Sequence, residues 1–284
     1  MVQASVSRRK SEGFVAVVLA LLAIFPPLST DMYLSAFNDI QAAFNVPDGS
    51  LEISLSVFFL GLGIGQLMVG PLIDRMGRRG PLLFGIAVFC IATVLLLCVD
   101  SVGPFIALRL VHAVWACGGM VVGRAVISDM YTGRRAIQML TLLVTLMSLS
   151  SITAPFLGSL LVTFVGWQSV FVMMLVVDLA AFGLSWWIIP ETLPVSRRTR
   201  TPITAAFRDY AGLFVGAENL SSAEPGGAAF VQAAVFSYII SSSSIFIGHY
   251  GLTNIQYGLC FGLVAVVSSS RRASTGSFSK RSAS

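Results

Sequence analysis

The sequence has few charged residues and few of the residues that form soluble active sites. Only 11% of its 284 residues are charged, and it contains two histidines and four cysteines. The cysteines lie in apolar runs without C-x-x-C spacing, so we expect neither a disulfide nor a metal site. The sequence also lacks the nucleotide-binding G-x-x-x-x-G-K, the hydrolase G-x-S-x-G and the metalloprotease H-E-x-x-H motifs. These absences argue against an enzyme.

The positive charge does not predict nucleic-acid binding. The net charge is +5, but nearly all lysines and arginines fall in short loops that would lie on one side of a membrane. A basic bias of this kind sets the orientation of a membrane protein. We therefore expect the lipid bilayer as a partner, and no nucleic acid.

Long apolar runs dominate the rest of the chain. Hydrophobic residues make up 56% of it and the mean hydropathy is +0.85. Runs of about 20 apolar residues are typical of transmembrane helices, which satisfy their own backbone hydrogen bonds in lipid. The sequence predicts an all-α polytopic membrane protein with eight spans, at residues 14–37, 51–69, 81–99, 104–127, 137–165, 169–189, 227–247 and 254–267.

A polar, proline-containing stretch divides the spans into two groups. Residues 191–210 contain Pro194, Pro202 and four arginines, and we interpret them as a cytoplasmic linker. The linker separates a six-helix bundle at 12–190 from a partial second bundle at 211–267. The serine- and arginine-rich residues 268–284 are expected to be disordered. The basic loops place both termini in the cytoplasm.

The loop between the second and third spans carries an ordered motif. It reads G-P-L-I-D-R-M-G-R-R-G, and its glycines allow close packing and a positive φ. We expect a tight cytoplasmic connection in which Asp74 meets Arg78 or a helix N-terminus. The residues of this signature loop are Gly70, Leu72, Asp74, Arg75, Gly77, Arg78 and Arg79.

Charged residues at membrane depth are costly and each one needs a reason. Asp31 is either an interfacial acid near the outer headgroups or a cavity acid that binds a proton or a cation. Arg109 and His112 are three residues apart, so they share one face of the fourth span. Arg109 either reaches the outer surface or is a buried cation that needs a carboxylate, for which Asp31 is the nearest candidate in depth.

Two further features lie in the fifth and sixth spans. Asp178 sits in the middle of an apolar run, and the sequence offers it no partner; it is either functional or a lesion. Pro155 and Gly158 combine a missing N–H with a small residue, a pattern that suits either a moving helix or a plain structural kink. An intramembrane enzyme is not favoured, because His112 has no evident serine partner.

Taken together, these motifs resemble the drug:proton antiporters of the major facilitator superfamily, and within it the bicyclomycin/chloramphenicol-resistance (Bcr/CflA) group. The resemblance covers residues 12–210 well and continues in patches to 266. It is carried by the signature loop, Ser29 to Leu34, Arg109 with His112, Ala154-Pro155-x-x-Gly158, Gly166 to Phe171, Pro190 to Pro194 and Phe236 to Ile239.

The resemblance implies a function and an architecture. Family members have twelve spans in two six-helix halves, so this chain corresponds to the N-terminal bundle plus about two helices. The implied activity is export of small drugs in exchange for protons across the inner membrane. The proton gradient supplies the energy, no cofactor is needed, and Asp31, Arg109 and His112 carry the coupling. The alternative is a truncated, transport-incompetent fragment, and we expect the chain alone to transport poorly or not at all.

The basic loops make a testable prediction about topology. Cysteine placed at Arg134 should be labelled only from the cytoplasmic side, whereas cysteine at Asp48 should react with reagent outside intact cells. Labelling of the Arg134→Cys variant from outside would show that the orientation is reversed.

Overall fold

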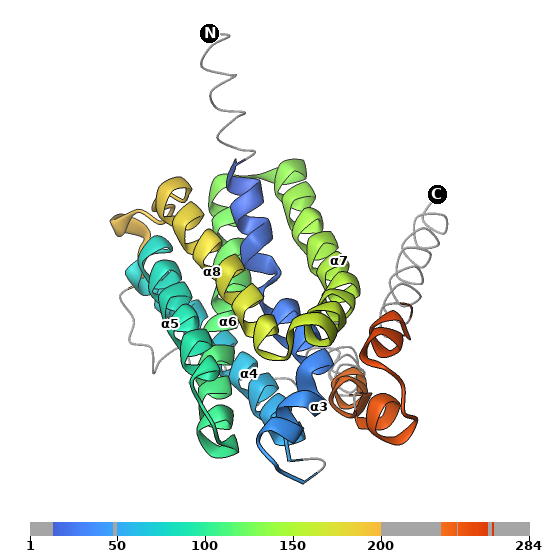
Figure 1. The fold of residues 1–284 in the computed structure, drawn as a ribbon. Helices are drawn as coiled ribbons and strands as arrows, with labels where there is room; N and C mark the ends of the chain where they lie inside the picture. Colours follow the sequence, from blue (N-terminus) through green and yellow to red (C-terminus); the bar gives the residue numbers. More distant parts are fainter. Residues whose placement is uncertain (1–13, 48–49, 200–233, 243, 261–262, 264–284) are drawn as a thin grey trace, which may run out of the picture.

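The computed structural model describes residues 14–47, 50–199, 234–242, 244–260 and 263, and these are almost entirely helical (Figure 1). No strand occurs among them. The predicted all-α fold is therefore confirmed. The disordered tail expected at 268–284 and most of the linker expected at 191–210 lie outside the described residues.

Six helices of the described chain are long and apolar enough to cross a membrane. They match the first six predicted spans, and only the fourth, Val102–Met130, extends beyond its predicted bounds at both ends. A shorter apolar helix, Ala234–His249, lies within the predicted seventh span, and residues 254–260 of the predicted eighth span are helical. The six long helices are Phe14–Ala43, α4 (Glu52–Met76), α5 (Arg79–Leu97), α6 (Val102–Met130), α7 (Gly133–Val165) and α8 (Gln168–Ile188).

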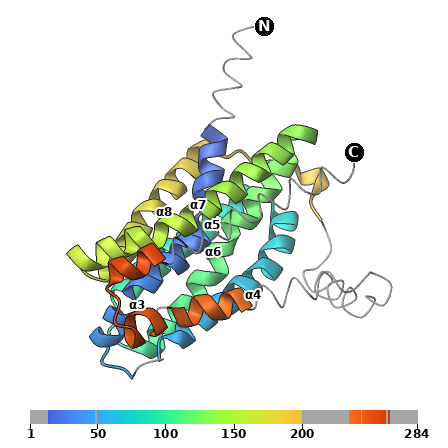
Figure 2. The same ribbon diagram turned by 90° about the vertical axis from the view of Figure 1, so that its right-hand side faces the viewer.

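The first span lies in the middle of the bundle (Figures 1 and 2). Its most apolar window is 67% buried, against 22–50% for the other five spans. It is not a uniform α-helix, because α2 (Phe25–Pro27) passes into a π-helical turn, η1 (Leu28–Met32), before α3 (Tyr33–Ala43). Two consecutive prolines remove two backbone donors at this point, which favours a local change of helix type.

Seven buried polar residues of the bundle lie near the level at which its two apolar clusters meet. The buried apolar side chains form these two clusters, one toward each end of the bundle. Along α5, α6 and α8 the sequence changes from one cluster to the other at a buried polar side chain, and along the first span it changes just before Ser29. We call this set the polar layer; it comprises Ser29, Thr30, Asp31, Thr93, Arg109, His112 and Asp178.

The signature loop is much shorter than predicted. The sequence indicated a loop from Gly70 onward, but α4 continues through Pro71 to Met76 and α5 begins at Arg79. Only Gly77, with φ +97°, and Arg78 connect the two helices. The positive φ expected at Gly77 is confirmed, whereas Gly70 is helical. Burial of Ile73 in the core accompanies the extra helical turns.

Helices α4 and α6 approach each other closely through glycine. An added methyl group at Gly61 would lie 2.7 Å from the Cβ of Ala113, and one at Gly65 would overlap the carbonyl oxygen of Val114. Small residues allow this approach between membrane helices. Gly61 and Gly65 are four residues apart, so they lie on one face of α4 and form this contact together.

The same geometry predicts a difference between two neighbouring glycines. Gly65→Ala should destabilise the folded chain by about 1–3 kcal/mol, because the methyl group has no space against α6. Gly63→Ala is the matched control, since nothing lies within 4 Å of an added methyl group there. Thermal unfolding in detergent measures both. Equal midpoints for the two variants would contradict the packing described here.

Candidate functional site

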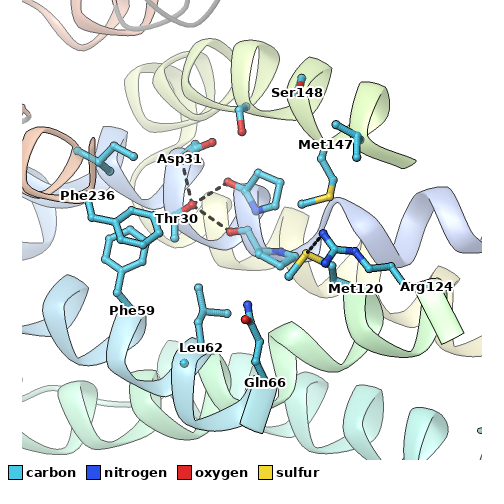
Figure 3. Close-up of a pocket in the computed structure, with 16 residues that line it drawn as sticks. Thr30, Asp31, Phe59, Leu62, Gln66, Met120, Arg124, Met147, Ser148 and Phe236 are labelled. Carbon is cyan, nitrogen blue, oxygen red and sulfur yellow. Dashed lines mark hydrogen bonds between the residues drawn. The ribbon is translucent and has the colours of Figure 1, made fainter. Parts of the chain in front are cut away.

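A cavity of about 670 Å³ lies between the first span, α4, α6 and α7, with the helix at 234–242 completing its wall (Figure 3). Its lining is mainly apolar and includes aromatic rings and two methionines. The ring of Phe59 on α4 stacks on that of Phe236 at 4.2 Å between centroids. The acidic side chain of Asp31 and the basic side chain of Arg124 reach the cavity at well separated places, as Figure 3 shows.

Asp31 lies in the wall of this cavity. Only 5% of its surface is exposed, and it belongs to the cavity lining, as the cavity interpretation expects; that it binds a proton or a cation stays a prediction. Thr30 Oγ1 lies 3.0 Å from Asp31 Oδ1, and Ser151 on α7 lies close to the same carboxyl group in the cavity wall. Thr30 Oγ1 also lies 3.0 Å from the carbonyl oxygen of Pro26, so the local helix fixes its position.

Arg109 does not pair with Asp31, so this prediction is wrong. Among the described residues, no carboxylate lies within 4.0 Å of its guanidinium group. It is fully buried, which also excludes the interpretation that it reaches the surface. Sequence position gave its depth correctly, but could not show the direction in which the side chain points from α6.

Three kinds of contact surround the Arg109 guanidinium group. The rings of Tyr33 and Phe58 lie 4.2 Å from it on the first span and on α4. Its Nη2 donates to the carbonyl oxygen of Ser29 at 3.1 Å. In a regular α-helix this carbonyl would accept the N–H of Tyr33, which here bonds to Thr30 O. Its Nη1 lies 3.4 Å from His112 Nδ1, so the two residues do share one helix face.

Asp178 has a partner that the sequence did not reveal. It is 1% exposed, and its Oδ2 lies 3.5 Å from the hydroxyl oxygen of Thr93 on α5. The expectation of no partner is therefore wrong. Thr93 lies 85 residues away along the chain, and its apolar neighbours gave it no distinguishing pattern.

The signature-loop residues form a charged cluster at the end of the bundle where α4 ends and α5 begins. Arg78 forms an ion pair with Asp74, as predicted, and a second with Asp129 of α6 at 3.0 Å. Burial disfavours the charged form of Arg78, but these two carboxylates outweigh it and raise its pKa. Arg79 Nη2 donates to the carbonyl oxygen of Trp186 on α8 at 2.7 Å. Gly70 and Leu72 lie half-buried within α4, and Arg75 is exposed.

Glu191 caps α5, a role that sequence analysis missed. Its carboxylate accepts the backbone N–H groups of Arg78 at 2.8 Å and Arg79 at 3.4 Å, at the positive end of the helix. Partial burial acts to raise its pKa, but these bonds, that of Leu193 and the nearby charge of Arg198 together lower it. An acid between Pro190 and Pro194, directly after a span, is the signal that could have identified it.

Pro155 and Gly158 lie where α7 crosses the first span. The carbonyl oxygen of Pro155 accepts from Ser35 Oγ at 2.9 Å. An added methyl group at Gly158 would lie 2.8 Å from the carbonyl oxygen of Met32. The pair therefore permits close contact between these helices; whether α7 moves at this point stays a prediction.

Arg124 is a cavity residue that the sequence analysis did not single out. It lies near the C-terminal end of α6, and its exposed side chain lines the cavity. Its Nη2 donates to Met120 Sδ, one helical turn earlier, at 3.7 Å. In the described part of the chain, no three His, Cys, Asp or Glu side chains gather in a way that could hold a metal ion.

A central bundle of six membrane helices around a partly polar cavity defines the class of polytopic membrane transporters. Residues 19–283 match the family described as the Major Facilitator Superfamily, and the chain belongs to this family. Family membership agrees with the expectation that the chain is not an enzyme.

Relatives and a solved structure agree with this assignment. The chain is 28% identical over 260 residues to the uncharacterised MFS-type transporter YdgK of Bacillus subtilis, and 28% identical over 255 residues to a bicyclomycin resistance protein homolog of Haemophilus influenzae. These matches cover 90% of this chain and 64% of each relative, so the chain spans about two thirds of the relatives' length. A bacterial homolog of the human lysosomal transporter Spinster, inward-facing and unoccupied, shares the fold with a TM-score of 0.68 at 15% identity, over 91% of this chain and 60% of that one.

The capping by Glu191 predicts a pH-dependent stability. A carboxyl whose folded-state pKa is lowered stabilises the fold above its unfolded-state pKa, and this contribution is lost as the pH falls through the folded-state pKa. Glu191→Gln should therefore lower the thermal midpoint at neutral pH and match the unmodified chain in acid. Glu52→Gln, at the start of α4, is the control. A deficit that is the same at every pH would contradict this role.

Proposed function

We propose that this chain acts in the export of small drugs in exchange for protons across the cell membrane. The observation that carries the proposal is a buried carboxyl group, Asp31, in the wall of the cavity between the first span, α4, α6, α7 and the helix at 234–242. The family and the names of the relatives support it, because they include bicyclomycin, chloramphenicol and multidrug resistance proteins.

The surroundings of Asp31 favour the reversible binding of a proton or a positively charged group. Its neighbours Thr30 and Ser151 contribute hydroxyl groups, which compensate only part of the cost of burying a charge. Among the described residues, no lysine or arginine forms an ion pair with it. The missing compensation can come from a proton or from the positive group of a drug. Because the carboxyl group can bind only one of these at a time, entry of one displaces the other.

The lining of the cavity suits amphipathic organic molecules. The rings of Phe59 and Phe236 offer flat apolar surface, and Met120 and Met147 have flexible thioether side chains that adapt to different shapes. Gln66 and Arg124 supply hydrogen-bond donors away from Asp31 (Figure 3). We therefore propose a small drug-like substrate with an apolar body and few polar groups.

Arg109 and His112 act on the site from behind the cavity wall. Arg109 binds the carbonyl of Ser29, two residues before Asp31, so a change at Arg109 reaches Asp31 through the η1 turn. We propose that Arg109 adjusts the proton affinity of Asp31 by its charge and by fixing this turn. His112 positions Arg109 through its Nδ1.

The proposed orientation follows the positive-inside rule. The ion-paired cluster of Asp74, Arg78 and Asp129 and the first turn of α7 would face the cytoplasm, with both termini. In a bacterial cell this places the chain in the inner membrane. Alternating access in this family moves two helix bundles about a central site, and we propose that Asp74 with Arg78 braces the first bundle against the second.

The central test removes the charge of the Asp31 side chain without changing the shape of that side chain. Asp31→Asn should abolish efflux that is sensitive to a proton uncoupler, because an amide cannot carry the proton, while membrane insertion remains normal. Drug accumulation in an efflux-deficient host measures this. Asp100→Asn, an exposed acid in the loop between α5 and α6, is the matched control. Unchanged efflux at several pH values would refute the assignment to Asp31.

The same assay distinguishes the alternative interpretation. A transport-incompetent fragment would insert into the membrane yet show no uncoupler-sensitive efflux in the unmodified chain. Uncoupler-sensitive efflux that depends on Asp31 would exclude that interpretation.

A further inference from the structure

A chain of polar side chains connects α6, α5 and α8 inside the polar layer. It runs from Arg109 to His112 Nδ1 at 3.4 Å, from His112 Nε2 to Thr93 Oγ1 at 3.0 Å, and from Thr93 Oγ1 to Asp178 Oδ2 at 3.5 Å. All four residues are at most 1% exposed, and none lines the drug cavity. The proposed transport site does not use its far end, Asp178.

The direction of the hydrogen bonds follows from donor and acceptor counts. An arginine can only donate, so His112 Nδ1 accepts and the proton of the neutral ring is on Nε2. That N–H then donates to Thr93 Oγ1. The single hydroxyl proton of Thr93 is left with two acceptors, the carbonyl oxygen of Phe89 at 2.9 Å and the carboxyl group of Asp178. Each donor thus points away from Arg109 and toward Asp178.

The two acceptors of Thr93 correspond to two states of Asp178. When Asp178 is ionised, the Thr93 hydroxyl group can donate to its carboxylate. When hydronium gives a proton to that carboxylate, the O–H of Asp178 donates to Thr93 Oγ1, and the Thr93 proton bonds to Phe89 O. The carboxyl O–H bond forms as one O–H bond of hydronium breaks and leaves water, and no other covalent bond changes. Both states leave the chain from Arg109 to Thr93 intact, so a small rotation of one hydroxyl group is sufficient for the change.

The groups around Asp178 are consistent with a carboxyl that changes charge. The Cys90 thiol on α5 interacts with it electrostatically, and His112 and Arg109 face it from α6 through Thr93. Helix α8 also packs against η1, which carries Asp31, and against α3, which begins at Tyr33. Among these groups Arg109 is the nearest permanent cation along the hydrogen-bonded chain, and no carboxylate in the described residues pairs with it directly.

We propose that Asp178 is a second proton-binding site of this bundle, connected through Thr93 and His112 to Arg109. In its ionised state Asp178 is the counter-charge of Arg109, through two intervening side chains. In its protonated state it leaves Arg109 without a counter-charge on this side. Because Arg109 also bonds to Ser29 O, the charge on Asp178 affects the η1 turn that holds Asp31. This last step rests on the proposed function; proton binding itself does not.

The test is pH-dependent infrared difference spectroscopy of the full chain in lipid nanodiscs, without drug. The C=O stretch of a protonated carboxylic acid reports each titrating buried acid directly. The unmodified chain should show a titrating band that Asp178→Asn removes and Asp31→Asn retains. Thr93→Val should move that band to higher frequency and shift its midpoint, because the hydroxyl partner is lost. Thr93→Ser keeps the hydroxyl group and should restore both properties, which a purely structural role of Thr93 does not predict.

The outcomes separate this proposal from the proposed function. Retention of every titrating band in a folded Asp178→Asn variant, or identical spectra for Thr93→Val and Thr93→Ser, would overturn the second proton site. If Asp178→Asn does not fold, the two Thr93 variants decide the question on the intact carboxyl group. Because the measurement needs neither drug nor a gradient, failure of the efflux assay with the Asp178 band present refutes transport and leaves this site in place.

Discussion

The buried guanidinium group of Arg109 is the charge around which the interior of the bundle is arranged. Placing an arginine at the centre of a membrane helix costs about 3 kcal/mol on insertion scales. Two desolvated cation–π contacts contribute about 2 kcal/mol each, and a hydrogen bond to a charged group about 2 kcal/mol. The contacts with Tyr33, Phe58 and Ser29 O therefore suffice to offset that cost without a carboxylate. They also tie α6 to the first span and to α4.

The same arrangement connects the two acids of the polar layer. Asp31 faces the cavity, whereas Asp178 is buried at the α5–α8 contact. Arg109 lies between them, bonded to the backbone near one and linked through His112 and Thr93 to the other. If both acids bind protons as we propose, this part of the bundle changes its charge in two places. Through Arg109 and the η1 turn, proton binding at either acid would then affect the wall of the cavity.

Much of the fold could be predicted from the sequence, because apolar runs and basic loops report insertion into lipid directly. The close contact at Gly61 and Gly65 depends on residue size, a property that the sequence states directly. The predicted end of α4 was placed too early, because Gly70-Pro71 is a pattern that ends helices in water. In the structure the helix continues, since Ile73 is buried in the core and Asp74 pairs with Arg78 one turn later. The partners of Arg109 and Asp178 could not be predicted. A sequence gives the depth of a residue in a span, but which neighbour it faces depends on helix rotation and packing.

The charged cluster where α4 ends and α5 begins combines contacts that hold the helices rigidly together with a contact that can be exchanged. Glu191 and Asp129 satisfy the N-terminus of α5 and the side chain of Arg78, which stiffens the connection between α4, α5 and the end of α8. Asp74 is half exposed and shares Arg78 with Asp129, so it can give up its bond at smaller cost than a buried partner could. The capping acid Glu191 therefore makes this end of the bundle rigid, whereas the exposed acid Asp74 can exchange its partner. In a protein whose function requires one bundle to move as a unit, this division lets the end of the bundle form and release outside contacts while its internal geometry is preserved.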